Sequence, residues 1–277
     1  MVTKTNYNRE EVDICLSVIV EIMTILGEYR NDIVLVGGWV PYFIIDKNKQ
    51  EHTGSIDVDL ALDFKNISDT KYRTILKLLQ EHEYAQGNQP FIFKRTIKQN
   101  NINYVIEKDL LSGEYGGTGK SHRTQKIQNI NIRKSRGCDL AFQYNFTHLI
   151  KKEMPDGSIN EVEIQIASII PFLVMKGMAL WDRMKEKDTY DIYFTIRHYD
   201  GGIEQLIDIF KNVKSNKLVK EGLGKIKAKF DNIDSIGPTR VAKFQEIQDE
   251  EETERVKRDS YEIINAFLIG IEVEKYH

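Results

Sequence analysis

Residues 33–39, IVLVGGW, and residues 55–63, SIDVDLALD, decide the fold of this chain. The first stretch is a run of four apolar residues that ends in two glycines, and an apolar pattern resumes at residues 39–45. This order predicts a buried strand, a tight turn and a helix. The second stretch alternates with period two, so Asp57 and Asp59 lie on one face of a strand and the apolar residues lie on the other.

The flanking sequence adds helices and further strands. Apolar residues at spacings of three and four predict an amphipathic helix over residues 9–29 that covers the sheet. From Ser168 onward the pattern is helical. We therefore predict an α+β protein, with a mixed-sheet domain at residues 1–167 and a helical C-terminal domain at residues 168–277. The other predicted elements are a helix at 69–83 and strands at 91–97, 102–111, 138–149 and 161–166.

The composition excludes several classes of protein. The chain has 277 residues, of which 41% are hydrophobic and 29% are charged, so it is not a disordered polyelectrolyte. No window holds the roughly 18 uninterrupted apolar residues of a spanning helix, because Lys176 interrupts residues 168–181. Residues 1–13 contain no apolar signal core, and Cys15 and Cys138 are too far apart for a Cys-built zinc site. We expect a cytoplasmic protein with reduced thiols and no membrane partner.

Positive charge is concentrated in one stretch. The whole chain has 39 basic and 42 acidic residues, a net charge of −3, and therefore no overall nucleic-acid signature. Residues 120–136 contain six cations and no acid, which makes them a local patch for a polyanion. The candidate nucleic-acid contacts in this patch are Lys120, Arg123 and Lys126, and its other cations are Arg133, Lys134 and Arg136.

The two aspartates of the alternating strand are candidate metal ligands. Carboxylates at i and i+2 on one strand face can hold a divalent cation between them, and Mg²⁺ or Mn²⁺ prefers such oxygens together with substrate phosphates. A third acid from a neighbouring strand would complete the site. Asp109 is the candidate because it lies near the end of the alternating run 102–111, and Glu107, on the same face, is the reserve.

The glycine pair is a candidate phosphate site. Gly37 and Gly38 follow a buried strand and precede a helix, so backbone N–H groups and the positive helix end can approach phosphates. The alternative for an isolated glycine pair is a plain turn. Ser55, a hydrogen-bonding residue just before Asp57, is a further candidate for nucleotide binding.

Together these features resemble the DNA polymerase β-type nucleotidyltransferase superfamily. Its signature is a strand, Gly-Gly or Gly-Ser, a helix, and then Dx[DE] on the next strand. Within the superfamily, LVGGWV at residues 35–40 and HTGSIDVDLALD at residues 52–63 look like the AbiEii/AbiGii toxin group. The resemblance implies a nucleotidyltransferase fold for the mixed-sheet domain.

A second block is similar to the same group. Residues 176–192, KGMALWDRMKEKDTYDI, read as one helix, place Arg183 and Lys187 about 20° to either side of Lys176 and Asp191 about 60° away. Core-like neighbours would bury Lys176, which then needs an anionic partner, either a triphosphate or the metal-site carboxylates. The alternative is a surface helix with snorkelling cations. The group's motif, a lysine, an arginine and then KDxxD, matches Lys176, Arg183, Lys187, Asp188 and Asp191.

The resemblance implies a Mg²⁺- or Mn²⁺-dependent enzyme that moves a nucleoside monophosphate from an NTP to an acceptor hydroxyl. RNA, tRNA included, is the implied acceptor, and an antitoxin protein is the implied partner. Asp57, Asp59 and Asp109 would bind the metal. Gly37, Gly38, Ser55, Lys176, Arg183 and Lys187 would bind the nucleotide, and Asp191 would orient Lys176 or accept the hydroxyl proton.

Two other functions remain open. Aminoglycoside and lincosamide nucleotidyltransferases also show GGW followed by a DxD strand, so the acceptor can be a small molecule. The protein can also be a non-catalytic domain that binds a nucleotide or a partner. A P-loop ATPase is disfavoured, because the motif before Gly119-Lys120 requires glycine where Glu114 stands.

Overall fold

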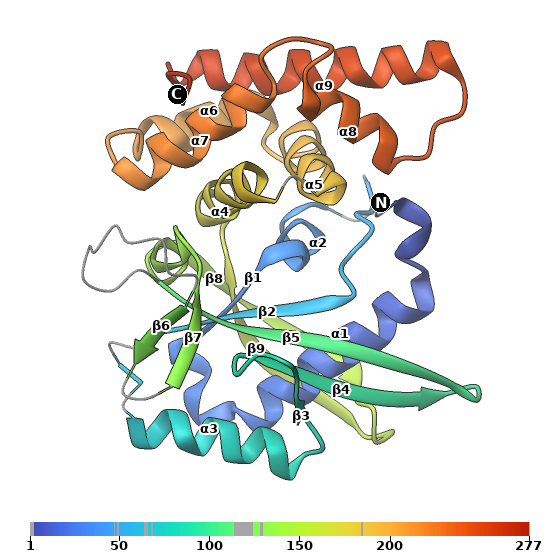
Figure 1. Cartoon of the computed structure of the whole chain (residues 1–277), viewed down its shortest axis with the longest axis vertical. Helices are drawn as coiled ribbons and strands as arrows, with labels where there is room; N and C mark the ends of the chain where they lie inside the picture. Colours follow the sequence, from blue (N-terminus) through green and yellow to red (C-terminus); the bar gives the residue numbers. More distant parts are fainter. Residues whose placement is uncertain are drawn as a thin grey trace. The chain divides into compact units, whose positions relative to one another are not determined.

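The computed structural model describes residues 3–46, 48, 50–63, 66–67, 69–113, 124–127, 130–183 and 185–276. The chain divides into two compact units (Figure 1). The sheet unit comprises Asn8–Val40 and Gly54–Ser168, and the helical unit comprises Met1–Tyr7, Pro41–Thr53 and Ile169–His277. Residues 1–7 and 41–53 were predicted to belong to the N-terminal domain, but their contacts group them with the helical unit.

The sheet unit is built on a mixed sheet in the order β3-β4-β5-β2-β1-β9-β8, and β7 pairs with β5 and β6. The β1–β9, β2–β5 and β5–β7 pairs are parallel, and the other pairs are antiparallel. The strands are β1 (Ile33–Val36), β2 (Asp57–Leu62), β3 (Ala85–Gln86), β4 (Ile92–Gln99), β5 (Ile102–Ser112), β6 (Thr124–Ile127), β7 (Ile130–Lys134), β8 (Asn145–Glu153) and β9 (Ile159–Ala167).

Helix α1 (Arg9–Ile25) covers one face of this sheet, and α3 (Asp69–Glu81) lies on the same side (Figure 1). The Asn8 side chain caps α1 by accepting a hydrogen bond from the Glu11 N–H. Val58 and Leu60 of β2 are buried. Because the register of β1, β9 and β8 places Leu60 on the same face as Lys152, which pairs with Asp13 of α1, the α1 side is the apolar side of β2.

The strand predicted over residues 138–149 is partly wrong. Cys138–Phe142 forms a 3-10 helix, η4, and β8 begins only at Asn145. Gly137 has a left-handed backbone with φ of 88°, which turns the chain out of the extended conformation, and Cys138 and Leu140 become buried from the helical turn. The β6–β7 hairpin was not predicted at all, because the surrounding stretch was recognised only by its charge.

The helical unit confirms the predicted helical C-terminal region. Its helices α4 and α7 cross closely, since a Cβ added to Gly177 would lie 2.1 Å from the carbonyl oxygen of Gly222. The helices are α2 (Val40–Ile44), which begins at the junction of the two units, α4 (Ile169–Asp182), α5 (Glu186–Arg197), α6 (Gly202–Lys211), α7 (Lys217–Lys229), α8 (Ile236–Phe244) and α9 (Glu250–Gly270).

The α+β class, with a mixed sheet and a helical C-terminal region, is therefore confirmed. Both cysteines, Cys15 and Cys138, are buried and free of disulfides. Among the helices that the structure describes, none has both the length and the apolar character that crossing a bilayer requires.

Candidate active site

The first group of candidate residues lies on the central strands β2 and β5. These strands run parallel, with Asp59 opposite Asp109 and Asp57 opposite Glu107. Directly paired residues on neighbouring strands point to the same side of a sheet. Asp57, Asp59, Glu107 and Asp109 therefore share the face opposite α1, as their alternation predicted, and we call them the carboxylate face.

The glycine turn lies directly against this face. Strand β1 is antiparallel to β2, with Val36 opposite Asp59, so Gly37 follows beside the aspartates. Gly37 has φ of 73°, and a Cβ added there would lie 2.1 Å from Oδ2 of Asp59. The indole N–H of Trp39 donates to the carbonyl oxygen of Asp57 at 2.9 Å, which ties the turn to the start of β2. Only glycine fits at position 37 without displacing the carboxylate.

The helix that follows the glycines is shorter than predicted. Gly37–Trp39 forms a 3-10 turn, η3, and α2 extends only over Val40–Ile44. Pro41 lies in this short helix, where its missing N–H costs nothing because first-turn N–H groups are unpaired anyway. A helix of five residues has only a small dipole. Any contribution to phosphate binding must therefore come from the N–H groups of the turn itself.

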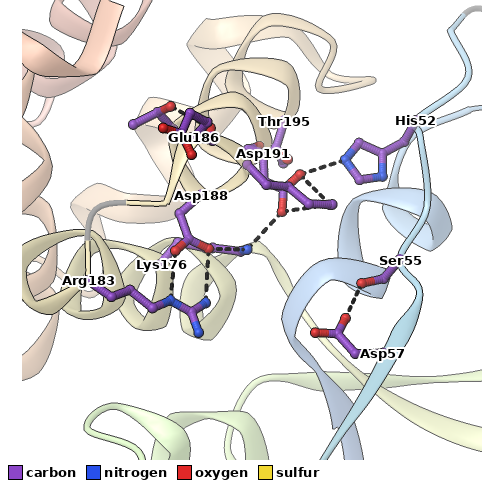
Figure 2. A network of polar contacts seen from close by, with 11 residues as sticks. His52, Ser55, Asp57, Lys176, Arg183, Glu186, Asp188, Asp191 and Thr195 are labelled. Carbon is purple, nitrogen blue, oxygen red and sulfur yellow. Dashed lines mark hydrogen bonds and ion pairs between the residues drawn. The ribbon is translucent and has the colours of Figure 1, made fainter. Parts of the chain in front are cut away.

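Asp57 is held by the residue two positions before it. The Ser55 hydroxyl donates to Oδ1 of Asp57, as Figure 2 shows. Ser55 is buried while Asp57 is exposed, so the hydroxyl fixes the carboxylate from the protein side. In the structure Ser55 thus orients Asp57, and its predicted contact with a nucleotide remains a prediction.

Two cations neutralise the β5 carboxylates. Arg133 of β7 forms an ion pair with Asp109, and Lys94 of β4 pairs with Glu107 at 2.7 Å. Burial raises the pKa of Asp109, Arg133 lowers it, and the charges of Asp57 and Glu107 raise it again, so the net pKa lies above its ordinary value. The ion pair shows that Asp109 faces a guanidinium in this arrangement.

The carboxylate face has the chemistry of a Mg²⁺ or Mn²⁺ site but not a completed one. Its donors are all oxygens, which suits a hard cation. The Gly37 turn packs directly on the Asp59 carboxylate. Among the described residues, no three carboxylate, imidazole or thiol side chains converge on one point as they would around a bound metal ion. Asp57 and Asp59 therefore fit as an initial pair, and Asp109 would have to leave Arg133 to join them.

The second group of candidates lies in the helical unit, where the single stripe predicted for residues 176–192 is wrong. Lys176 lies in α4, which ends at Asp182, and Lys187 and Asp191 lie in α5, which begins at Glu186. Lys185 between them has an extended backbone. Acids in the first turn of α5 favour a new helix start there. Packing of α4 against α5, rather than one helix face, brings the charges together.

Lys176 is already neutralised within the helical unit. Its ammonium lies 2.8 Å from Oδ1 of Asp188 and 2.7 Å from Oδ2 of Asp191. Figure 2 shows the Asp188 carboxylate between Lys176 and Arg183, whose Nε lies 2.9 Å from Oδ2. Lys187 Nζ lies 2.8 Å from Oδ1 of Asp191. The anionic partner that a buried lysine requires is therefore supplied by two aspartates.

Coulombic attraction dominates the pKa values of these groups. Burial lowers the pKa of Lys176, but Asp188 and Asp191 raise it to a net value above the ordinary one. Burial raises the pKa of Asp188 and of Asp191, but the neighbouring cations lower both pKa values below the ordinary range. At their formal charges, the three cations and two carboxylates of the cluster leave one net positive charge.

His52, which is not among the candidates from the sequence, also contacts this cluster. Its Nε2 lies 3.0 Å from Oδ1 of Asp191, and both side chains are fully buried. Burial lowers the pKa of His52 from 6.5 to about 4, so the imidazole is neutral and donates its Nε2 proton to Asp191. The two residues are 139 positions apart, and no local pattern could have paired them.

Two sets of predicted contacts stay predictions. Lys120 and Arg123 lie outside the described residues, and Lys126 lies in β6 but its side chain is not among those described. Lys176 belongs to the helical unit, whereas Asp57 and Asp59 belong to the sheet unit. Because each unit is described by itself, the predicted approach of Lys176 to these carboxylates also stays a prediction.

No protein-family model matches this chain, and no curated protein matches it. Among solved structures, JHP933 from Helicobacter pylori aligns with a TM-score of 0.43 at 15% identity, over 96% of this chain and 94% of that one. The STING-associated CdnE c-di-GMP synthase from Capnocytophaga granulosa aligns with a TM-score of 0.28 at 11% identity, over 96% and 83%. At these values neither neighbour carries a functional conclusion, and the resemblance to the AbiEii/AbiGii group rests on its motifs alone.

Proposed function

We propose that this chain is a nucleotidyltransferase that moves a nucleoside monophosphate from an NTP to an acceptor hydroxyl. The observation that carries the proposal is the Gly37 turn, which lies against the Asp59 carboxylate while Asp109 lies opposite Asp59 on the parallel strand. A turn without a side chain lets a phosphate approach the backbone closely, next to carboxylates that can hold its counter-cation. A plain surface turn does not require glycine for this reason.

The chain's own residues would bind and orient the reactants. Asp57, fixed by Ser55, and Asp59, fixed against Gly37, would hold Mg²⁺ or Mn²⁺. When bound, that cation supplies charge neutralisation for the triphosphate and the leaving pyrophosphate. The acceptor hydroxyl loses its proton to solvent, and its oxygen forms a bond to the α-phosphorus. The bond from that phosphorus to the bridging oxygen breaks, and pyrophosphate leaves with the electron pair. Positioning and charge neutralisation supply most of the acceleration.

The helical unit contributes the KDxxD cluster to the proposal. Its net positive charge favours a polyphosphate, and Arg183 is its most accessible cation, with 39% of the side chain exposed against 9% for Lys176. We assign triphosphate contact to Arg183, with Lys176 and Lys187 behind it. Asp191, which binds both lysines, is a positioning residue.

The acceptor we propose is RNA, tRNA included, with the basic stretch 120–136 as its contact surface, because six cations without an acid attract a polyanion. By resemblance, the physiological role would be that of a toxin in a toxin–antitoxin or abortive-infection system, with an antitoxin as partner.

The test is incubation of the purified protein with each labelled NTP, Mg²⁺ and total RNA. We expect label in RNA, and a loss of about 100-fold or more for Asp59→Asn. Glu161→Gln, which changes an exposed carboxylate of β9, is the matched control and should keep full activity. Transfer that survives Asp59→Asn would contradict the proposal. Transfer to an aminocyclitol or sugar but not to RNA would keep the reaction and replace the acceptor.

A further inference from the structure

Arg133 occupies a place on the carboxylate face that the proposed reaction does not explain. It pairs with Asp109, which is opposite Asp59. The backbone of β7 is fixed to β5 by the parallel pairing of Arg133 with Leu111. The guanidinium therefore extends from an anchored strand, and 39% of its side chain is exposed. It can move without moving the sheet.

The carboxylate face concentrates negative charge. Neighbouring strands are about 4.8 Å apart, and alternate residues on one strand are about 6.6 Å apart. Four carboxylates at such spacings repel one another. Arg133 and Lys94 are the cations that the structure places on Asp109 and Glu107. One positive charge per β5 carboxylate is thus already present without any metal ion.

The two ion pairs differ in a way that assigns them different roles. Asp109 is 16% exposed, whereas Glu107 is 50% exposed and its partner Lys94 is 40% exposed. A solvent-exposed ion pair contributes little to the stability of the folded protein. The Arg133 pair is partly shielded, and it lies at the strand position of Asp59, where Gly37 closes the other side. It therefore occupies the position where a third metal ligand would act.

We propose that Arg133 is the counter-cation of the metal-free carboxylate face, that a divalent cation displaces it from Asp109, and that the released guanidinium binds the polyphosphate of the incoming nucleotide. This inference rests on the proposed function. Arginine suits the second role because its planar fork binds phosphate oxygens in pairs. Arg133 would thereby leave the RNA-binding patch and join the nucleotide site.

Mn²⁺ binding in the absence of nucleotide tests the displacement, measured by calorimetry and by the EPR signal of free Mn²⁺. Arg133→Met removes the competing charge and should bind Mn²⁺ about tenfold more tightly. Arg133→Lys keeps the charge and should bind within about threefold of wild type, which also covers the case in which Arg133→Met fails to fold. Lys94→Met, the matched control, should stay within about twofold.

Nucleotide binding tests the second step, with a non-hydrolysable NTP analogue at saturating Mn²⁺. Arg133→Met should bind the analogue about tenfold more weakly, and Lys94→Met should bind as wild type does. Unchanged Mn²⁺ affinity in Arg133→Met, or an equal change in Lys94→Met, would overturn the displacement. Unchanged analogue affinity in Arg133→Met would overturn the transfer of Arg133 to the nucleotide.

Asp59→Asn separates this inference from the proposed function. It should lose Mn²⁺ binding if the carboxylate face is the metal site. Loss in Asp59→Asn together with no change in Arg133→Met would reject only the role of Arg133. Wild-type Mn²⁺ affinity in Asp59→Asn would reject the metal site, and with it the proposed function.

Discussion

At the scale of single residues, Gly37 is where the backbone and a carboxylate meet. Gly37→Ala adds a methyl group 2.1 Å from Oδ2 of Asp59 and keeps a left-handed residue. We expect it to lose about 1 kcal/mol of stability from the backbone and to weaken Mn²⁺ binding by at least about tenfold, because Asp59 must move. Urea unfolding and Mn²⁺ titration measure the two effects.

Gly157→Ala is the control for this change. Gly157 has φ of 84° in the turn between β8 and β9, and an added Cβ would meet no atom within 4 Å. It should show the same backbone cost and unchanged Mn²⁺ affinity. If Gly37→Ala bound Mn²⁺ as well as Gly157→Ala does, the turn would have no part in the site.

Lys108, on the α1 side of β5, is a second residue with a measurable cost. It is 1% exposed, and its Nζ has no hydrogen-bond partner among the described residues. Burial lowers its pKa well below 10.5, although Glu21 opposes the shift. Below pH 10.5 the Lys108 amine is protonated in the unfolded chain, but it binds a proton less readily in the folded chain. The free energy of unfolding should therefore rise as the pH approaches 10.5.

Lys108→Met should therefore stabilise the protein at pH 7 by about 1 kcal/mol or more, even after loss of the contact between Nζ and the Tyr84 ring at 4.4 Å. The gain should shrink between pH 7 and pH 10. Lys98→Met, at an exposed position of β4, should change neither the free energy of unfolding at pH 7 nor that at pH 10. Urea unfolding at both pH values measures these effects. A loss of stability in Lys108→Met would show that the buried Lys108 ammonium contributes favourably to the folded state.

The sequence predicted those site residues whose position follows from strand alternation. Asp57 and Asp59 share a face because the period of a strand is two, and Asp109 lies opposite Asp59 because β2 and β5 pair in register. The partners Arg133 and His52 could not be predicted. Each depends on which distant segments pack together, and that information is not contained in local spacing.

At the scale of elements, the packing of α4 on α5 depends on Lys176. The sequence alone predicts that Lys176→Met leaves the fold intact, but the structure changes that expectation. Removal of the Lys176 ammonium leaves Asp188 and Asp191 buried with fewer cations, which should lower the free energy of unfolding by about 3 kcal/mol or more. Arg183→Met, at a more exposed position, should cost less. Thermal unfolding measures both effects. A melting temperature of Lys176→Met equal to that of the wild-type protein would contradict a buried ion cluster.

The contact between α5 and the segment that contains His52 should make the protein acid-sensitive. The folded pKa of His52 is about 4 and the unfolded pKa is 6.5, so only the unfolded chain binds the proton between these values. Stability is complete above pH 6.5 and falls as the pH decreases towards 4, by about 3 kcal/mol at most. The lowered pKa values of Asp188 and Asp191 extend the loss below pH 4.

His52→Gln keeps a hydrogen-bond donor to Asp191 and removes the titration. Its unfolding free energy should be flatter than that of wild type between pH 6.5 and pH 4. His198, whose pKa is also lowered by burial, titrates in both proteins and cancels in the comparison. Parallel pH profiles for the two proteins would mean that folding does not lower the pKa of His52.

At the scale of the whole molecule, the sequence predicted two regions in order, and the chain has two units that are interleaved. The change to a helical pattern after Ser168 is visible locally in the sequence, and the contacts also divide the chain between Ser168 and Ile169. The return of residues 41–53 to the helical unit is not visible in the sequence, because it depends on Ile45 joining the buried cluster of Tyr190, Phe194 and Phe244.

The interleaving predicts that residues 169–277 will not fold stably alone. The fragment lacks His52, which binds Asp191, as well as Ile45 and Tyr7, which pack on the cluster around Phe244. Loss of the His52 hydrogen bond to Asp191 and an open apolar cluster each cost about 2 kcal/mol or more, a large part of the stability of a domain. We expect low helicity and no cooperative thermal transition by circular dichroism. Ile45→Ala in the full chain should lower the melting temperature for the same reason. A fragment that melts cooperatively with native helicity would show that the helical unit needs neither segment.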